Sequence, residues 1–159
     1  PVGNTDSELA FCYLLDQLVE KFGYETPSLE DIFTLLEQLA PQIAEFGTFN
    51  YCLSNGQALF SYATTKLHWI VREYPFQSAR LIDLEVEVDF SDVTTSDDRV
   101  AVITTEPLTK NEEWQAYRPG EMILFQGGRP IKTALTTIDR LIREEKNPEL
   151  KRITKADQY

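Results

Sequence analysis

Apolar residues recur at helical spacing over the first part of the chain. An apolar stripe at intervals of three and four predicts a helix over residues 6–22, and Gly23 marks its end. The members of the stripe are Phe11, Leu14, Leu15, Leu18 and Phe22.

A second helix is predicted to begin near Thr26-Pro27-Ser28. Pro41 is expected to kink this helix or to end it at Ala40, because the proline ring excludes the carbonyl one turn back. Its apolar stripe comprises Leu29, Ile32, Phe33, Leu36, Leu39, Ala40 and Ile43.

From Thr48 the period of apolar positions changes from helical to alternating, which is typical of strands. Residues 49–53 and 58–62 alternate on either side of Asn55-Gly56, which predicts a hairpin with a type I′ turn. Further strands are expected at residues 67–73, at 100–104, where an apolar run suggests cover on both faces, and last at 122–125.

Residues 82–90 alternate strictly between apolar and acidic side chains. Successive acids on one face of a strand lie about 6.6 Å apart and diverge, which favours a solvated strand face over a metal site. We therefore predict no metal here. The acids are Asp83, Glu85, Glu87 and Asp89.

The C-terminal part has one more apolar stripe, which suggests a short amphipathic helix ending before Asn147-Pro148. Residues 147–159 have little to bury and are expected to form a mobile tail, so the domain is assigned to residues 1–146. The stripe of this helix comprises Leu135, Ile138, Leu141 and Ile142.

The predicted fold class is α+β, with two helices on one side of antiparallel strands.

The formal net charge of −11 argues against a nucleic-acid partner, because phosphate binding depends on Lys and Arg, and it makes amines or cations likelier ligands. No apolar run approaches the ~20 residues that span a bilayer, so we expect a cytoplasmic chain without a membrane partner. The two cysteines, Cys12 and Cys52, are too few for a disulfide scaffold and are interpreted as reduced core residues.

The start of the first helix carries the candidate chemistry. Thr5 and Glu8 have the spacing of a capping box, in which Glu8 would accept from the amide of Thr5. Asp6 then occupies the first helical position, where an ammonium group could bind its carboxylate. An acid at this position more often only stabilises the helix start.

The run Gly3-Asn4-Thr5-Asp6-Ser7-Glu8 with Ala10-Phe11-Cys12 resembles the helix start of class II glutamine amidotransferases, which are N-terminal-nucleophile hydrolases. In that family this aspartate receives the α-amino group of glutamine, and the resemblance implies the same role for Asp6 alone. Later segments resemble a stand-alone bacterial subgroup of the family: Phe49 to Gly56, Leu67 to Ile70, Thr105 to Thr109, Glu112, Trp114, and Pro119 to Glu121.

The resemblance implies a four-layer αββα sandwich with antiparallel sheets, glutamine or a γ-glutamyl amide as substrate, and no cofactor. The family's nucleophile is an N-terminal cysteine, whereas this chain begins with Pro1. We therefore expect the C-terminal part of such a domain, inactive alone and without a catalytic residue of its own. Its expected partner is the missing N-terminal half, or another copy of the chain.

Several alternatives stay open. The chain could serve a γ-glutamyl peptide or amide hydrolase, a catalytically inactive binding module, or a structural partner of another chain. Pro1 as the general base of a small tautomerase is disfavoured, because it leads into a capped helix rather than a strand. We assign no chemical role to His68, interpreted as a packed or hydrogen-bonded strand residue, or to Glu106, Glu112 and Trp114, interpreted as loop anchors.

Overall fold

The computed structural model describes residues 1–76, 78–82, 87–88 and 95–146, and for residues 87–88 the backbone alone. The chain divides into two compact units, which we describe separately. Unit 1 comprises residues 1–49 and the segment from residue 136 onward, and unit 2 comprises residues 50–135. The predicted C-terminal tail, residues 147–159, lies outside the described residues.

Unit 1 is helical. Helices α1 (Asp6–Phe22) and α2 (Leu29–Ala44) lie side by side, and α3 (Asp139–Lys146) is the third helix of the unit. In the part of unit 1 that the structure describes, α1 buries only Leu14, whereas Phe11 and Leu15 of the predicted stripe are 48% and 40% exposed. The prediction of a helix over residues 6–22 is confirmed, but most of its apolar stripe is not buried.

Helix α2 starts with a capping box, in which the Ser28 side chain accepts from the amide of Asp31 while the Asp31 carboxylate accepts from the amide of Ser28. Of the two outcomes predicted at Pro41, an end of the helix at Ala40 is wrong, because α2 continues through Pro41 to Ala44. Near this proline the side chain of Gln42 donates to the carbonyl of Gln38 at 2.9 Å, which gives that oxygen a partner inside the helix.

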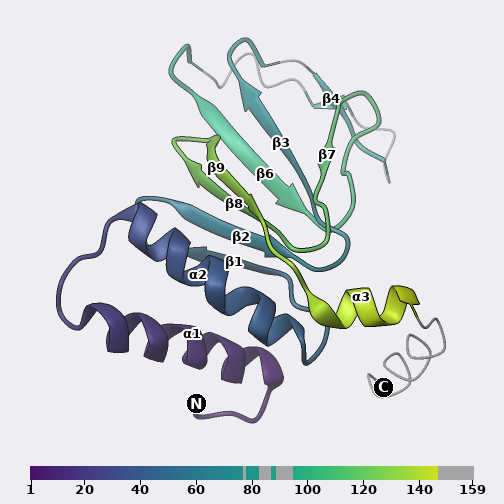
Figure 1. The fold of residues 1–159 in the computed structure, drawn as a ribbon. Coiled ribbons are helices and arrows are strands. Elements are labelled where there is room, and N and C mark those ends of the chain that lie inside the picture. Colours follow the sequence, from purple (N-terminus) through teal and green to yellow (C-terminus); the bar gives the residue numbers. More distant parts are fainter. Residues whose placement is uncertain (77, 83–86, 89–94, 147–159) are drawn as a thin grey trace. The chain divides into compact units, whose positions relative to one another are not determined.

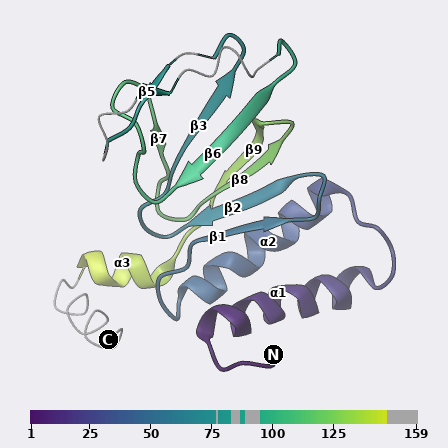
Figure 2. The ribbon, with the colours of Figure 1, turned by 180° about the vertical axis from the view of Figure 1, so that it is seen from behind.

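The two larger sheets among the described residues of unit 2 are antiparallel and face each other, as both ribbon views show (Figures 1 and 2). Side chains from both sheets form one core, in which the ring of Trp69 meets that of Phe125 edge-on at 5.6 Å between centroids. The four-stranded sheet has the order β1-β2-β8-β9, with β1 (Tyr51–Ser54), β2 (Leu59–Ala63), β8 (Glu121–Gln126) and β9 (Arg129–Leu135). The three-stranded sheet has the order β6-β3-β7, with β6 (Arg99–Thr104), β3 (His68–Glu73) and β7 (Gln115–Ala116).

The strands β4 (Ala79–Arg80) and β5 (Glu87–Val88) form a two-stranded ladder at the predicted acidic strand. Residues 83–86 and 89–90, with Asp83, Glu85 and Asp89, lie outside the described residues, as do the side chains of β5. Among the described residues no cluster of His, Cys, Asp or Glu could hold a metal ion.

The α+β class with antiparallel sheets is confirmed, and three details of the strands differ from the predictions. Strand β6 is an edge strand with Val100 43% exposed, so it is not covered on both faces. Strand β8 is central rather than last, because β9 follows it. Cys12 and Cys52 are free as expected, but Cys52 is exposed rather than in the core.

The β1–β2 hairpin forms where the sequence predicts it, but its turn is not of type I′. Ser54 pairs with Leu59, so four residues separate the strands, and Asn55 does not have the positive φ that a type I′ turn requires. The side-chain oxygen of Asn55 instead accepts from the amides of Gln57 and Ala58, both at 3.0 Å. The side chain thereby builds a wider loop than the one predicted.

Candidate substrate-binding site

The N-terminus of α1 is capped on two sides. The hydroxyl of Thr5 accepts from the amide of Glu8 at 3.2 Å, as predicted. The Glu8 carboxylate does not take the predicted amide of Thr5. It accepts from the amide of Val2 at 2.6 Å and from that of Gly3 at 2.9 and 3.0 Å, and these bonds lower the pKa of Glu8. Through these hydrogen bonds Glu8 holds Val2 and Gly3, which lead into the helix, against the first turn of α1.

Gly3 allows this arrangement because it has no side chain. A Cβ atom at position 3 would fall on the carboxylate of Glu8. A side chain at this position would therefore require the end of the Glu8 side chain to shift.

Asp6 occupies the first position of α1 and is exposed. One carboxylate oxygen, Oδ1, accepts from the amide of Ser7 at 2.7 Å and from its hydroxyl at 3.3 Å. Among the described residues, no other donor and no cationic side chain contacts this carboxylate, which leaves Oδ2 open to a ligand.

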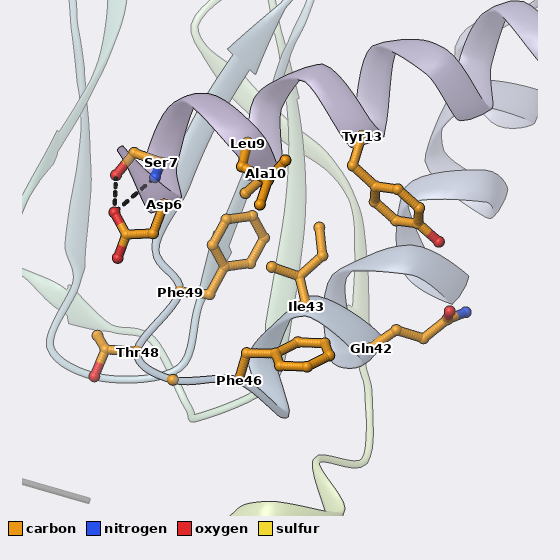
Figure 3. Close-up of a pocket in the computed structure, with 11 residues that line it drawn as sticks. Asp6, Ser7, Leu9, Ala10, Tyr13, Gln42, Ile43, Phe46, Thr48 and Phe49 are labelled. Carbon is orange, nitrogen blue, oxygen red and sulfur yellow. Dashed lines mark hydrogen bonds between the residues drawn. The ribbon is translucent and has the colours of Figure 1, made fainter. Parts of the chain in front are cut away.

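Asp6 stands at one end of a pocket of about 650 Å³ that lies entirely within unit 1 (Figure 3). One wall is the face of α1 that carries Leu9, Ala10 and Tyr13, three, four and seven residues after Asp6. This spacing places all four on one side of a helix. Figure 3 shows Asp6 and Ser7 at one end and Tyr13 at the other.

The opposite wall comes from the end of α2 and the segment that follows it. Phe46 is 93% exposed, although it is a large apolar residue. Phe49 was predicted in a strand, but β1 begins at Tyr51 and Phe49 lines the pocket instead. This wall comprises Gln42, Ile43, Phe46, Gly47, Thr48 and Phe49.

The pocket therefore combines one carboxylate with mainly apolar walls. Its volume lies in the range of small-molecule sites, ~300–1,000 Å³. The carboxylate can bind a cationic group, and the apolar walls would exclude water from the body of a ligand. Sequence reasoning found Asp6 but none of the apolar lining residues, although Leu9, Ala10 and Tyr13 follow from the helical spacing of Asp6.

The four residues without an assigned role lie in unit 2, so the structure does not bring them into this pocket. Glu112 forms a two-pronged pair with Arg72, at 2.7 Å to Nε and 2.6 Å to Nη2. Thr109 donates to the same carboxylate, and Trp114 Nε1 donates to the Thr109 hydroxyl at 2.9 Å. Glu112 and Trp114 thus anchor the loop between β6 and β7.

His68 and Glu106 lie at the other end of that loop. His68 Nδ1 is hydrogen-bonded with the carbonyl of Thr105 at 3.1 Å, which agrees with its interpretation as a hydrogen-bonded strand residue. Glu106 pairs with Lys66 at 2.7 Å on the surface.

Comparison with known proteins gives the site its context. Residues 1–149 match the sequence profile of the glutamine amidotransferases class-II. The chain belongs to this family. Within it, the chain is 46% identical over 131 residues to the Escherichia coli protein named "Putative glutamine amidotransferase YafJ", covering 82% of this chain and 51% of that protein. It is 39% identical over 137 residues to a Haemophilus influenzae protein of similar name, covering 86% of this chain and 46% of the relative.

A solved structure of the same family agrees in fold. A crystal structure described as a "predicted glutamine amidotransferase" from Pseudomonas aeruginosa matches with a TM-score of 0.73 and 42% identity, over 83% of this chain and 52% of that one. This class II amidotransferase chain thus spans about half the length of the relatives it matches. No helix among its described residues has the length and apolar character needed to cross a membrane.

Proposed function

We propose that this chain is the glutamine-recognising part of a class II glutamine amidotransferase, and that Asp6 binds the α-ammonium group of glutamine. The observation that carries the proposal is the open oxygen of Asp6 at the end of a pocket. A charge-assisted contact to an ammonium group suits this carboxylate, because Asp6 meets no competing cation among the described residues.

In the proposed reaction, the nucleophile is the thiolate of an N-terminal cysteine that lies outside these residues. It attacks the side-chain carboxamide carbon of glutamine, a C–S bond forms, the C–N bond breaks, and ammonia leaves with a proton passed on by the α-amino group of that cysteine. Water then cleaves the γ-glutamyl thioester and releases glutamate. Asp6 forms no covalent bond in this sequence and acts by holding the substrate in place.

We also propose that the remainder of the domain packs on unit 1 and completes a four-layer αββα sandwich. Two observations support this. The chain covers only 51% and 46% of the length of two relatives, and unit 1 exposes large apolar side chains, with Leu9 at 62%, Val19 at 65% and Phe46 at 93%. Exposed apolar surface of this kind marks an interaction site.

A second candidate is a γ-glutamyl peptide or amide hydrolase of the same fold. The size and apolar walls of the pocket favour it, because they leave room for a substrate larger than glutamine. Both candidates assign the same role to Asp6, since both substrates carry the same α-amino group.

The test is the substitution Asp6→Asn in the full-length protein, with ammonia release as the readout. We expect kcat/KM for glutamine to fall about tenfold or more, because a charge-assisted contact is worth about 1.5–3 kcal/mol and each decade of rate costs about 1.4 kcal/mol. The melting temperature should change by only a few degrees, since an acid in the first turn contributes about 0.3–1 kcal/mol to the helix.

Asp16→Asn is the matched control, because it makes the same change at an exposed position of the same helix outside the pocket. It should leave kcat/KM unchanged. A variant Asp6→Asn that melts much lower and hydrolyses glutamine normally per folded molecule would make Asp6 a helix cap only. Glutamine binding without ammonia release by the full-length parent would identify an inactive binding module.

A further inference from the structure

The C-terminus of α2 is stabilised by a residue from a distant part of the chain. The last turn of α2 contains no basic residue to meet the negative end of the helix dipole. Arg140 of α3 supplies one. Its Nε donates to the carbonyl of Ala44 at 2.9 Å, and its Nη2 donates to that of Gly47 at 3.1 Å. One planar guanidinium thus holds the last carbonyl of α2 and a second carbonyl in the segment that follows the helix.

The contact is reciprocal, because α2 in turn stabilises the start of α3. The carboxylate of Glu45 accepts from the amide of Arg140 at 2.9 Å, in the first turn of α3, and from Arg143 Nη2 at 2.6 Å. Partial burial raises the pKa of Glu45, but the hydrogen bonds from Arg140 and Arg143 outweigh this effect, so its pKa lies below the usual value. The carboxylate therefore stays charged at neutral pH.

Arg140 is also fixed along α3. Its Nη1 donates to Glu144 at 2.6 Å, and the two side chains are only 13% and 10% exposed. The guanidinium thus has partners on three of its nitrogens, all within unit 1. Such a fork holds its acceptors in a defined geometry, which a single flexible ammonium group cannot do.

The backbone that Arg140 binds leads into the wall of the pocket opposite Asp6. Residues 45–49, which we call the exit segment, lead out of α2 and supply Phe46, Gly47, Thr48 and Phe49 to the pocket. Arg140 does not line the pocket, but it holds the carbonyl that precedes this segment and the carbonyl of Gly47 within it. Arg140 therefore binds the backbone that carries this wall of the pocket.

We propose that Arg140 is a positioning residue of the glutamine site, which sets the pocket wall opposite Asp6 through the exit segment. The inference rests on the proposed function of that pocket. Without the guanidinium the carbonyl of Gly47 in the exit segment and that of Ala44 just before it lose this anchor, and Phe46 and Phe49 are free to move relative to α1. The substrate then binds more weakly, while the reacting groups, which lie elsewhere, keep their chemistry.

The experiment compares Arg140→Gln, Arg140→Lys and Arg143→Gln in the full-length protein, with KM and kcat for glutamine measured separately. Arg140→Gln should raise KM about fivefold or more while kcat stays within about twofold, the signature of lost uniform binding. Arg140→Lys should fall between this variant and the parent, because it restores the charge but not the fork. Arg143→Gln removes the same charge from the same helix and breaks a bond to the Glu45 side chain, but it contacts neither carbonyl, so KM should rise less than in Arg140→Gln.

A lower melting temperature with an unchanged KM in both Arg140 variants would overturn the proposal, because Arg140 would then be only structural. A fall in kcat at unchanged KM would overturn it as well. If Arg140→Gln does not fold, the test is the KM of Arg140→Lys: a KM above that of the parent supports the proposal, and an unchanged KM overturns it. The variant Asp6→Asn distinguishes a failure of the proposed function from a failure of the role of Arg140. If Asp6→Asn leaves kcat/KM unchanged, the proposed function is wrong. If Asp6→Asn lowers kcat/KM while the Arg140 variants have a normal KM, only the role of Arg140 is wrong.

Discussion

Asp6 and Glu8 are two acids in the same helical turn with opposite surroundings. Both oxygens of Glu8 accept from backbone amides, whereas Asp6 has hydrogen bonds from Ser7 on one oxygen only. Sequence alone assigns both residues to the helix start. The division of roles appears only when the path of residues 1–4 is known, because that path brings the amides of Val2 and Gly3 to Glu8.

The Arg72–Glu112 pair gives a prediction about pH. The two side chains are 18% and 14% exposed. Partial burial raises the pKa of Glu112, but hydrogen bonds from Arg72 and Thr109 lower it by more, so the folded pKa lies below the unfolded one. The pair therefore adds stability above the unfolded pKa, about 4.3, and this stability is lost as the pH falls through the folded pKa.

We expect Glu112→Gln to lower the free energy of unfolding by about 1.5–3 kcal/mol at pH 7, as for hydrogen bonds to charged groups. Urea unfolding at a series of pH values should show this difference shrinking in acid. Glu106→Gln is the control, because its pair with Lys66 is 61% and 78% exposed and should matter little at any pH. If Glu112→Gln lowered the free energy of unfolding by the same amount at neutral and at acid pH, the lowered pKa that we assign to Glu112 would be contradicted.

At the scale of elements, periodicity predicted the helices and most of the strands but not the turns. Asn55-Gly56 has the composition of a type I′ turn, yet the Asn55 side chain accepts two amides and makes a wider loop. The two-residue turn is at Gly127-Gly128, where both φ angles are positive, 57° and 73°, and Gln126 pairs with Arg129. The hydrogen bonds of the Asn55 side chain distinguish the wider loop at Asn55-Gly56 from the two-residue turn at Gly127-Gly128. The spacing of apolar residues in the sequence does not reveal such bonds.

Strand β9 was missed because its apolar residues do not mark its buried face. Ile131 and Leu135 are 51% and 53% exposed, and the half-buried positions between them include Lys132. An edge strand with this pattern has the right period but gives no apolar signal.

The two turns yield a prediction with an internal control. A Cβ atom at Gly128 would meet the backbone oxygen of Arg99 at 2.7 Å, whereas one at Gly56, also at positive φ, would meet nothing within 4 Å. Gly56→Ala should cost only the strain of a left-handed residue, about 1–2 kcal/mol. Gly128→Ala should cost about 1–3 kcal/mol more, because backbone must shift. If urea unfolding showed that both variants lose the same free energy of unfolding, the backbone of β6 at Arg99 would be able to shift at no cost.

At the scale of the whole molecule, the fold class and the place of Asp6 at the start of α1 could be predicted, but the pocket could not. The motif at residues 3–8 identifies Asp6 because its residue types are contiguous. The opposite wall lies some forty residues later and meets α1 only through packing of the two helices. The contact of Arg140 with α2 spans an even longer separation and has no sequence signal, since a single arginine on a short helix is ordinary.

The last prediction concerns the apolar surface of unit 1. Leu9 and Phe46 line the pocket and are 62% and 93% exposed, and they belong to the surface on which we propose that the remainder of the domain packs. We expect this chain alone to bind an apolar dye and to associate with itself as its concentration rises, or to bind the remainder of the domain when that is supplied. Light scattering over a concentration series measures the first, and titration with the separately expressed remainder measures the second.

A double variant, Leu9→Gln with Phe46→Gln, should weaken the association and the dye binding, because it removes apolar surface from the pocket while leaving both helices intact. Tyr24→Gln is the control, since Tyr24 is also fully exposed in unit 1 but does not line the pocket. Were the parent chain monomeric at high concentration and unable to bind either the dye or the remainder, the exposed apolar wall would belong to a ligand site alone. In that case the proposed packing on unit 1 would be wrong, while the role of Asp6 would stand on its own test.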